Sequence, residues 1–120
     1  MKPFIEDTSF GSITVAGKTY EHDVVINLKG EVNKRKKKLS KEIYGTSHKV
    51  SLKEAGYIMN EEAELVIIGN GQYGVLELSE EARDFFRGKK CKTKILPTPE
   101  AVKAWNKESG KVVGMFHVTC

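Results

Sequence analysis

The first third of the chain alternates short β-prone runs with glycine-containing turns. Residues 12–15 are rich in β-branched side chains, and residues 16–18 have the composition of a tight turn. The next extended run covers residues 19–28, with its apolar centre at residues 24–26, and a third run follows at residues 31–36. Short strands joined by glycine turns predict an antiparallel β-meander at this end of the chain.

The middle of the chain contains one clear helix signal after a polar stretch. Residues 39–49 are polar and irregular, and their turn-forming side chains predict a loop. Ser51 and Glu54 then have the spacing of a capping box, in which the serine caps the first turn of a helix. We expect a short helix from there to about residue 59, with a buried stripe formed by Leu52, Ala55, Ile58 and Met59.

Three strands are predicted in the second half of the chain. Residues 65–68 form a continuous apolar run, which is typical of a central strand covered on both faces. Residues 92–96 alternate polar and apolar side chains, which indicates a strand nearer an edge of the sheet. Residues 112–118 form the last apolar run and the last expected strand.

Helices are predicted between these strands. Ser79 can cap a helix that continues to about residue 87. Thr98 as a cap, followed by Pro99 at the first helical position, predicts another helix to about residue 107. Strands and helices in this alternation pair in parallel through crossover connections. The predicted fold class is therefore α/β, with a mixed central sheet, a C-terminal βαβαβ unit and an added N-terminal antiparallel β-meander.

The composition fits one globular domain over residues 1–120. Apolar residues make up 39% and charged residues 30%, values that argue against disorder. The two cysteines, Cys91 and Cys120, are too few for a disulfide framework and form no CxxC pair. No run approaches the ~20 apolar residues of a membrane helix, and the first ten residues lack the apolar core of a secretory leader. We therefore expect a cytoplasmic location and no membrane association.

Positive charge is concentrated in one segment. The net charge is +4, but residues 33–53 alone hold eight basic side chains and one acid. The densest part predicts contact with nucleic acid or an acidic partner through Lys34, Arg35, Lys36, Lys37 and Lys38. No aromatic residue interleaves with this run, so nucleic-acid binding would be weak and would lack base stacking. The alternative is a solvated edge strand, on which lysines block pairing with another strand.

Several local patterns together resemble a known family. They are the runs at residues 9–11, 17–26, 66–74 and 97–106, and the ending Phe116-His117-Val118-Thr119-Cys120. The chain is similar, over nearly its whole length, to the small archaeal and bacterial Mth-type domain family. That family includes the adipogenesis-associated domain-containing protein and a mitochondrial assembly factor of respiratory complex I. The resemblance implies an α/β fold with a mixed sheet and an extra antiparallel layer, and it implies no catalytic residues.

The glycine-rich loop after the strand at residues 65–68 is the leading candidate for a ligand site. Gly69, Gly71 and Gly74 match the G-x-G-x-x-G spacing. A dinucleotide site is excluded, because no helix begins directly after the loop and no acid follows the next strand. The backbone N–H groups of such a loop can still form an anion-binding nest.

The predicted topology brings other segments to this loop. Ligands of parallel sheets bind beyond the carboxyl ends of the strands, where residues 97–98 and 118–120 should also lie. We expect one ligand cleft there, lined by Gly69, Asn70, Gly71, Tyr73, Gly74, Thr98 and Thr119. The alternative is a loop whose glycines serve only its turns.

The histidines and cysteines give no clear chemical constellation. His117 and Cys120 are three residues apart, so an extended strand would point them to opposite faces. No third group that would orient the histidine is visible in the sequence, and we predict no catalytic residue. His22, His48 and His117 lie at no metal-ligand spacing, so we predict neither a metal site nor a cofactor.

These observations lead first to a non-enzymatic interaction or assembly module, with a protein partner whose identity is open. The chain itself would be a monomer or a small homo-oligomer. The first alternative is small-anion or small-ligand binding, with or without catalysis, at the glycine loop and the strand ends. The second alternative is a weak nucleic-acid contact through the basic run at residues 34–38.

Overall fold

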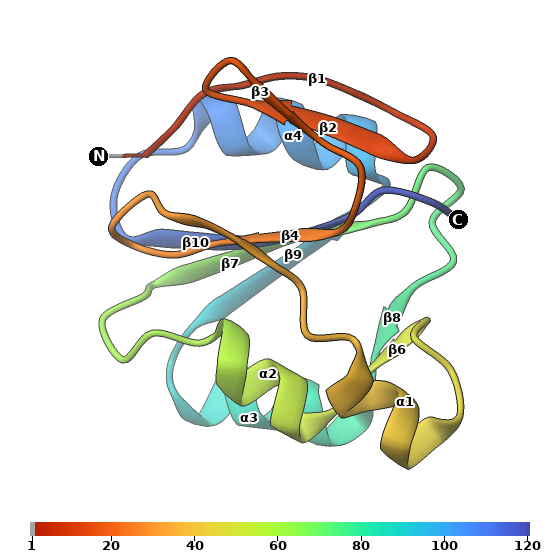
Figure 1. The fold of residues 1–120 in the computed structure, drawn as a ribbon. Helices are drawn as coiled ribbons and strands as arrows, with labels where there is room; N and C mark the ends of the chain where they lie inside the picture. The colour runs from red at the N-terminus through yellow and green to blue at the C-terminus, as the bar shows by residue number, and fades with distance from the viewer. Residues whose placement is uncertain (1) are drawn as a thin grey trace.

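The computed structural model describes residues 2–120 and shows three layers, of which a central sheet is the middle one (Figure 1). The central sheet is mixed and has five strands. In spatial order these are β5 (Val32–Lys34), β4 (Val24–Ile26), β10 (Val112–His117), β7 (Leu65–Asn70) and β9 (Lys92–Leu96). Strand β10 pairs in parallel with β7 and antiparallel with β4, and β7 pairs in parallel with β9.

The layer above the sheet in Figure 1 combines a small antiparallel sheet with one helix. The small sheet contains β1 (Ile5–Ser9), β2 (Ser12–Val15) and β3 (Lys18–Tyr20), and the helix is α4 (Thr98–Lys107). Their apolar side chains pack with the upper face of the central sheet. Trp105 of α4 meets Phe116 of β10 edge to face, with ring centroids 5.7 Å apart, and both side chains are fully buried.

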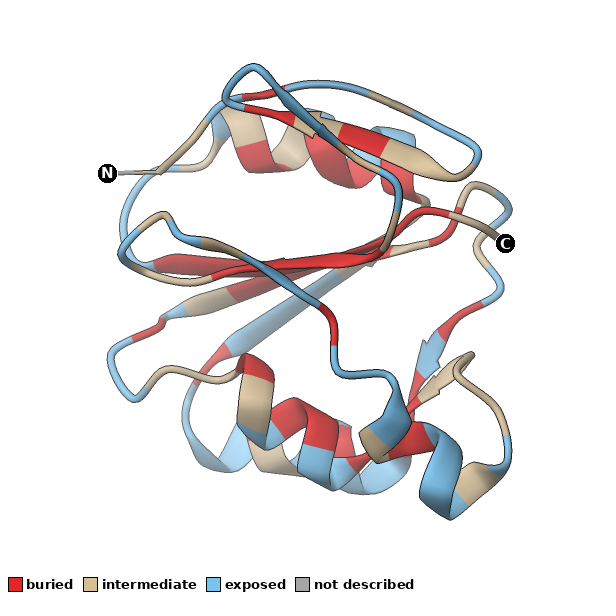
Figure 2. Ribbon diagram, viewed as in Figure 1, coloured by how far each residue is buried: buried red, intermediate tan, exposed pale blue. Residues whose placement is uncertain are grey.

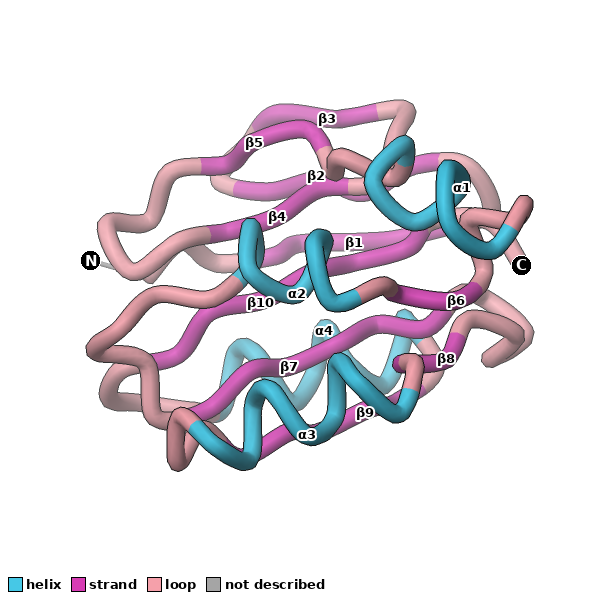
Figure 3. The backbone as a smooth tube through the Cα atoms, turned by 90° about the horizontal axis from the view of Figure 1, so that it is seen from below, coloured by secondary structure: helices cyan, strands magenta, loops and turns pink. Residues whose placement is uncertain are grey.

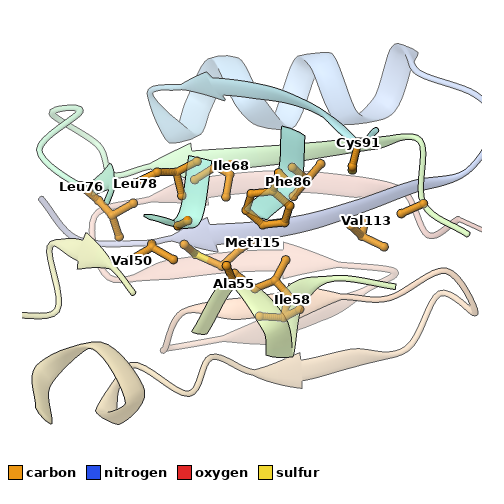
Figure 4. Packing of buried hydrophobic residues seen from close by; sticks show 14 residues of the cluster. Val50, Ala55, Ile58, Ile68, Leu76, Leu78, Phe86, Cys91, Val113 and Met115 are labelled. Carbon is orange, nitrogen blue, oxygen red and sulfur yellow. The ribbon is translucent and has the colours of Figure 1, made fainter. Parts of the chain in front are cut away.

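The layer below the sheet contains the other three helices, which Figure 3 shows spread across that face. They are α1 (Lys38–Tyr44), α2 (Leu52–Ile58) and α3 (Glu80–Gly88), accompanied by a two-stranded parallel ribbon of β6 (Lys49–Val50) and β8 (Glu77–Leu78). Their core is a cluster that includes Ile58 and Phe86 from the helices and Ile68 and Met115 from the sheet (Figure 4).

Strands β7 and β10 are covered on both faces, and Figure 2 colours most of their residues red, as buried. Alternate residues of β10 serve opposite cores: Met115 packs below the sheet and Phe116 above it. The continuous apolar run at residues 65–68 is explained by the same double coverage. The predicted central strand, the predicted edge position of residues 92–96 and the predicted βαβαβ unit are all confirmed.

The first third of the chain differs from the prediction at two places. The sequence predicts one strand at residues 19–28, but this run splits into β3 and β4, which belong to different sheets. Asp23 marks the crossing, because its side chain is tied to β10 and cannot continue a surface strand. Strand β1, at residues 5–9, is not predicted, since its sequence carries two acids and no apolar alternation.

Three helix predictions also need correction. Leu52, expected in the buried stripe of the helix that ends near residue 59, is 48% exposed. The loop predicted at residues 39–49 is wrong for residues 39–44, which belong to α1, and is confirmed for residues 45–48, which begin with Gly45 in a left-handed conformation. The cap predicted at Thr98 is also wrong: Pro97 holds the cap position of α4, and no side chain caps this helix. The hydroxyl of Thr98 instead donates to the carbonyl of His117. The caps predicted at Ser51 and Ser79 are confirmed, since each side chain accepts an amide of its own helix.

We predict opposite stability changes for two glycine-to-alanine substitutions. A Cβ atom at Gly114 would lie 2.7 Å from Phe116 and 2.9 Å from Trp105, so Gly114→Ala should destabilise the fold by roughly 1–3 kcal/mol. Gly56 lies inside α2 with nothing near its Cβ position, so Gly56→Ala should stabilise by about 0.5–1 kcal/mol. Urea unfolding monitored by tryptophan fluorescence measures both, and changes of the same sign would contradict the packing described.

Candidate functional site

Asp23 stands at the start of β4 and connects that strand to the end of β10. Its Oδ1 accepts the amide of Val118 at 2.8 Å, and its Oδ2 lies 2.7 Å from Nδ1 of His117. Burial alone would raise the pKa of Asp23, but His117, the Val118 amide and Arg35 outweigh it and lower the pKa to about 2. Asp23 is therefore an ionised carboxylate at neutral pH.

Arg35 follows β5 and is the buried cation opposite that carboxylate. Its Nη1 donates to Asp23 Oδ2 at 2.9 Å, and its Nη2 donates to the carbonyl of Ser47 at 2.7 Å. Nε and Nη2 also donate to the two oxygens of Glu54, on α2. Burial would lower the pKa of Arg35, but hydrogen bonds and charges from Glu54 and Asp23 outweigh this and raise it. The guanidinium is thus held between two carboxylates.

Two serines complete the surroundings of Glu54. Ser40 of α1 donates its hydroxyl proton to Glu54 Oε1, and the Glu54 amide donates to the Ser51 hydroxyl at 3.1 Å. The Ser51 amide in turn donates to Ser40 Oγ at 2.9 Å. Both serines and Glu54 are fully buried. The Ser51 cap at the start of α2 therefore also seats a buried carboxylate. The reciprocal bond of the predicted capping box is not formed, because the Ser51 amide donates to Ser40 and not to Glu54.

His117 ends β10 and lies between Asp23 and a polar cleft. Its Nε2 is 3.3 Å from the Thr119 hydroxyl oxygen, and its ring meets that of His48 edge to face at 5.4 Å. The cleft beside it, here called the histidine cleft, has a volume of about 240 Å³. It is lined by Gly11, Glu21, His22, Asp23, Lys34, Arg35, Lys37, Ser47, His48, His117, Val118 and Thr119.

The predicted glycine-loop segments do meet, but through hydrogen bonds rather than around a space. The Gly71 amide donates to the Thr98 hydroxyl at 2.9 Å, and the Gln72 amide donates to the Thr119 carbonyl at 2.6 Å. The amides of Tyr73 and Val75 donate to the carbonyl of Cys120. Because these amides are already engaged, the loop does not offer the anion nest that its sequence suggested.

The seven residues expected in one cleft are divided by the structure. Thr119 lines the histidine cleft, whereas Thr98 is fully buried and Tyr73 is exposed. Gly69, Gly71 and Gly74 serve close packing and turns. Asn70 stays inside the loop: its Nδ2 donates to Gly74, and its buried Oδ1 has no hydrogen-bond partner among residues 2–120.

The basic run at residues 34–38 is also divided. Lys34 and Lys37 are exposed and line the histidine cleft, and Lys36 lies over the ring of Tyr57 at 4.7 Å. Lys38 begins α1 and is exposed. Arg35 does not belong to this surface, since its side chain is 1% exposed. The sequence does not predict the burial of Arg35, because that burial depends on Asp23 and Glu54, which are distant in the sequence and pair with it only in the folded chain.

Two further features concern metals and membranes. No group of three or more histidine, cysteine or acidic side chains that could hold a metal ion occurs within residues 2–120. In the same part of the chain, no helix combines the length and apolar character that a membrane crossing requires.

Cys91 and Cys120 are free thiols, and burial raises the pKa of Cys91.

Comparisons with known proteins match the whole chain to uncharacterised proteins. Residues 5–117 match the family described as a protein of unknown function, DUF498/DUF598. The conserved hypothetical protein PH1505 from Pyrococcus horikoshii OT3 is 33% identical, with 100% of both chains covered and a TM-score of 0.91. The structure named MT938 is 34% identical over 99% of this chain and 100% of its own, with a TM-score of 0.85.

More distant structures share the fold alone. A Bordetella pertussis protein described as a Mth938-like domain is 14% identical over 97% of this chain and 85% of its own, with a TM-score of 0.65. Among curated proteins, none matches the chain.

We predict that removing one charge from the buried network is costly. In Glu54→Gln the new amide nitrogen must face an N–H group of Arg35 in either orientation, because Arg35 donates to both carboxylate oxygens, and in one orientation it also faces the Ser40 hydroxyl. Breaking a buried pair in this way should lower the free energy of unfolding by roughly 3–5 kcal/mol. The control Glu42→Gln, on the exposed side of α1, should change it by less than about 0.5 kcal/mol. Equal effects in urea unfolding would contradict the network.

Proposed function

The chain belongs to the DUF498/DUF598 family of proteins of unknown function, and we propose that it binds a small ligand carrying an anionic group in the histidine cleft. The observation that carries the proposal is the lining of this cleft. Two lysines, three histidines and one exposed acid, Glu21, line it, together with Asp23 and Arg35 of the buried network.

The charges favour an anion. Within residues 2–120, Lys34 and Lys37 form no salt bridge, unlike Arg35, whose charge is already paired with Glu54 and Asp23. His22 lines the cleft and donates from Nδ1 to the carbonyl of Asp23, so the positive charge at the cleft comes from the two lysines. Clustered cations at a concave site raise the local concentration of anions.

The size of the cleft limits the ligand. A volume of about 240 Å³ corresponds to roughly eight water molecules at ~30 Å³ each. This is below the range of about 300–1,000 Å³ that holds drug-sized ligands. A phosphate group or a carboxylate on a short carbon skeleton fits this space, whereas a dinucleotide exceeds it.

Inorganic phosphate provides a direct test of this proposal. We expect saturable shifts of amide signals around the histidine cleft in a nuclear magnetic resonance titration. The double substitution Lys34→Gln/Lys37→Gln should weaken binding at least about tenfold, since a tenfold change corresponds to only about 1.4 kcal/mol. The matched control is Lys36→Gln/Lys38→Gln, which removes the same charge from the same run outside the cleft lining. Equal weakening by both pairs, or no saturable shift, would refute the cleft as the site.

A second candidate function, the interaction module, is favoured by one exposed aromatic pair. Phe10 and Tyr73 are 58% and 75% exposed, and their ring centroids lie 6.0 Å apart. Val75, on the same loop as Tyr73, is also exposed. Grouped apolar side chains on a surface mark contact sites for proteins. A second copy of this chain is the partner whose binding can be measured with purified protein alone.

Sedimentation velocity over a range of concentrations distinguishes the outcomes for this surface. Phe10→Ser/Tyr73→Ser should abolish any self-association, and the exposure of both rings predicts little change in stability. Phe4→Ser is the matched control, because Phe4 is 61% exposed and belongs to a different patch. A wild-type chain that remains monomeric at all concentrations would argue against self-association through this pair.

A further inference from the structure

Three side chains at the histidine cleft form a continuous hydrogen-bonded row. Asp23 Oδ2 lies 2.7 Å from His117 Nδ1, and His117 Nε2 lies 3.3 Å from Thr119 Oγ1. We infer that this row is a nucleophilic relay, in which Thr119 accepts an acyl group from a small anionic acyl compound bound in the cleft. The inference rests on the proposed function, because the anionic group is what the cleft would bind.

The position of the protons on the row follows from Asp23. An ionised carboxylate only accepts hydrogen bonds, so His117 must donate from Nδ1. In the neutral ring, Nε2 then carries a lone pair and accepts the proton of the Thr119 hydroxyl. This is the tautomer that a general base requires: one nitrogen is oriented by a buried carboxylate and the other faces the nucleophile.

Asp23 also fixes the backbone between the other two members of the row. Its second oxygen accepts the amide of Val118, the residue between His117 and Thr119. One carboxylate therefore holds both the imidazole ring and the peptide that carries the threonine. The distance of 3.3 Å between His117 Nε2 and Thr119 Oγ1 is slightly longer than an ideal hydrogen bond, as is common for catalytic pairs without substrate.

Glu54 compensates the charge of Arg35, which would otherwise oppose a positive charge on His117. Arg35 shares Asp23 Oδ2 with His117, and an unpaired guanidinium there would oppose a positive imidazole. Glu54 takes two hydrogen bonds from Arg35 and compensates its charge. The charge of Asp23 therefore remains to stabilise the imidazolium formed when His117 accepts a proton.

The acyl-transfer step balances with the groups of the cleft, the acyl compound and water. Thr119 Oγ1 forms a bond to the acyl carbon while its proton moves to His117 Nε2. The bond from the acyl carbon to the leaving oxygen then breaks, and the leaving group takes the proton from Nε2. Lys34 and Lys37, on the same cleft, stabilise negative charge on the substrate. Water completes the cycle: its oxygen bonds to the acyl carbon while His117 Nε2 takes its proton, the bond from the acyl carbon to Thr119 Oγ1 breaks, and Oγ1 takes the proton from Nε2 as the free acid leaves.

Acetyl phosphate is the probe, because it joins an activated acetyl group to an anion that fits the cleft. We expect a rapid burst of one phosphate per chain followed by slower steady release as water removes the acetyl group, and, in samples quenched after the burst, a peptide carrying one O-acetyl group at Thr119 by mass spectrometry. Thr119→Ser should keep this reaction and Thr119→Val should abolish it. The control Thr93→Val, at an exposed position of β9, should react like the unmodified chain.

The orienting groups are tested separately from the nucleophile. His117→Gln should abolish acetylation of Thr119, and Asp23→Asn should slow it by roughly a hundred-fold or more, as expected when the ring loses its correct tautomer. Nitrogen-15 shifts of the His117 ring provide a readout that a structural role would not give. They should show protonated Nδ1 in the wild type and lose that preference in Asp23→Asn.

Each outcome decides between the two proposals. Acetylation at Thr119 that is unchanged in a folded His117→Gln or Asp23→Asn chain would overturn the relay. Thr119→Val changes one partly exposed side chain, so it remains informative if the buried variants fail to fold. Phosphate binding without acetylation would overturn the relay and leave the proposed function standing. Absence of both binding and acetylation would overturn both.

Discussion

The pairing of Arg35 with Asp23 and Glu54 is the interaction on which the arrangement of this domain depends. Its partners come from the start of β4, from α2 and from the Ser47 loop, so one side chain joins the central sheet to the lower helices. Burying three charged groups costs several kcal/mol for each ion, and only complete hydrogen bonding offsets that cost. Here Ser40, Ser51 and the Val118 amide supply the remaining bonds. A network that is satisfied only in one arrangement selects that arrangement over other packings of α1 and α2.

The fold was more predictable from the sequence than the site, for a physical reason. Continuous apolar runs and cap residues are local signals, and they led correctly to β7, β10, α2 and α3. The site depends on Asp23 and His117, which are 94 positions apart and meet only through the pairing of β4 with β10. The sequence contained one usable hint: Asp23 directly precedes the apolar residues 24–26, where a charge needs a buried partner. The position of Asp23 in the sequence does not identify that partner. The sequence therefore does not predict that Asp23 contacts His117.

For the glycine loop, the sequence correctly predicts that residues 69–74, 97–98 and 118–120 come together. The reason differs from the predicted one, because these segments bind each other through hydrogen bonds. Gly71 has a φ of +108°, and a Cβ atom there would lie 2.1 Å from the backbone of Cys120. A glycine is required so that the loop can approach the end of the chain closely enough for its amides to donate to the Thr119 and Cys120 carbonyls. The same bonds use the amides that an anion would need. Glycine spacing alone cannot distinguish a loop that binds a ligand from a loop that packs against another segment of the same chain.

These two observations together explain why the histidine cleft lies where it does. Residues 118–120 are held on one side by the glycine loop, through the Thr119 and Cys120 carbonyls, and on the other by Asp23. Thr119 is thereby fixed in the backbone while its hydroxyl stays at the cleft. A site needs this combination of rigid support and an accessible polar atom, because a group displaced by about 1 Å loses most of its effect. The glycine loop thus contributes to the candidate site as the support for Thr119, although its own amides are used within the chain.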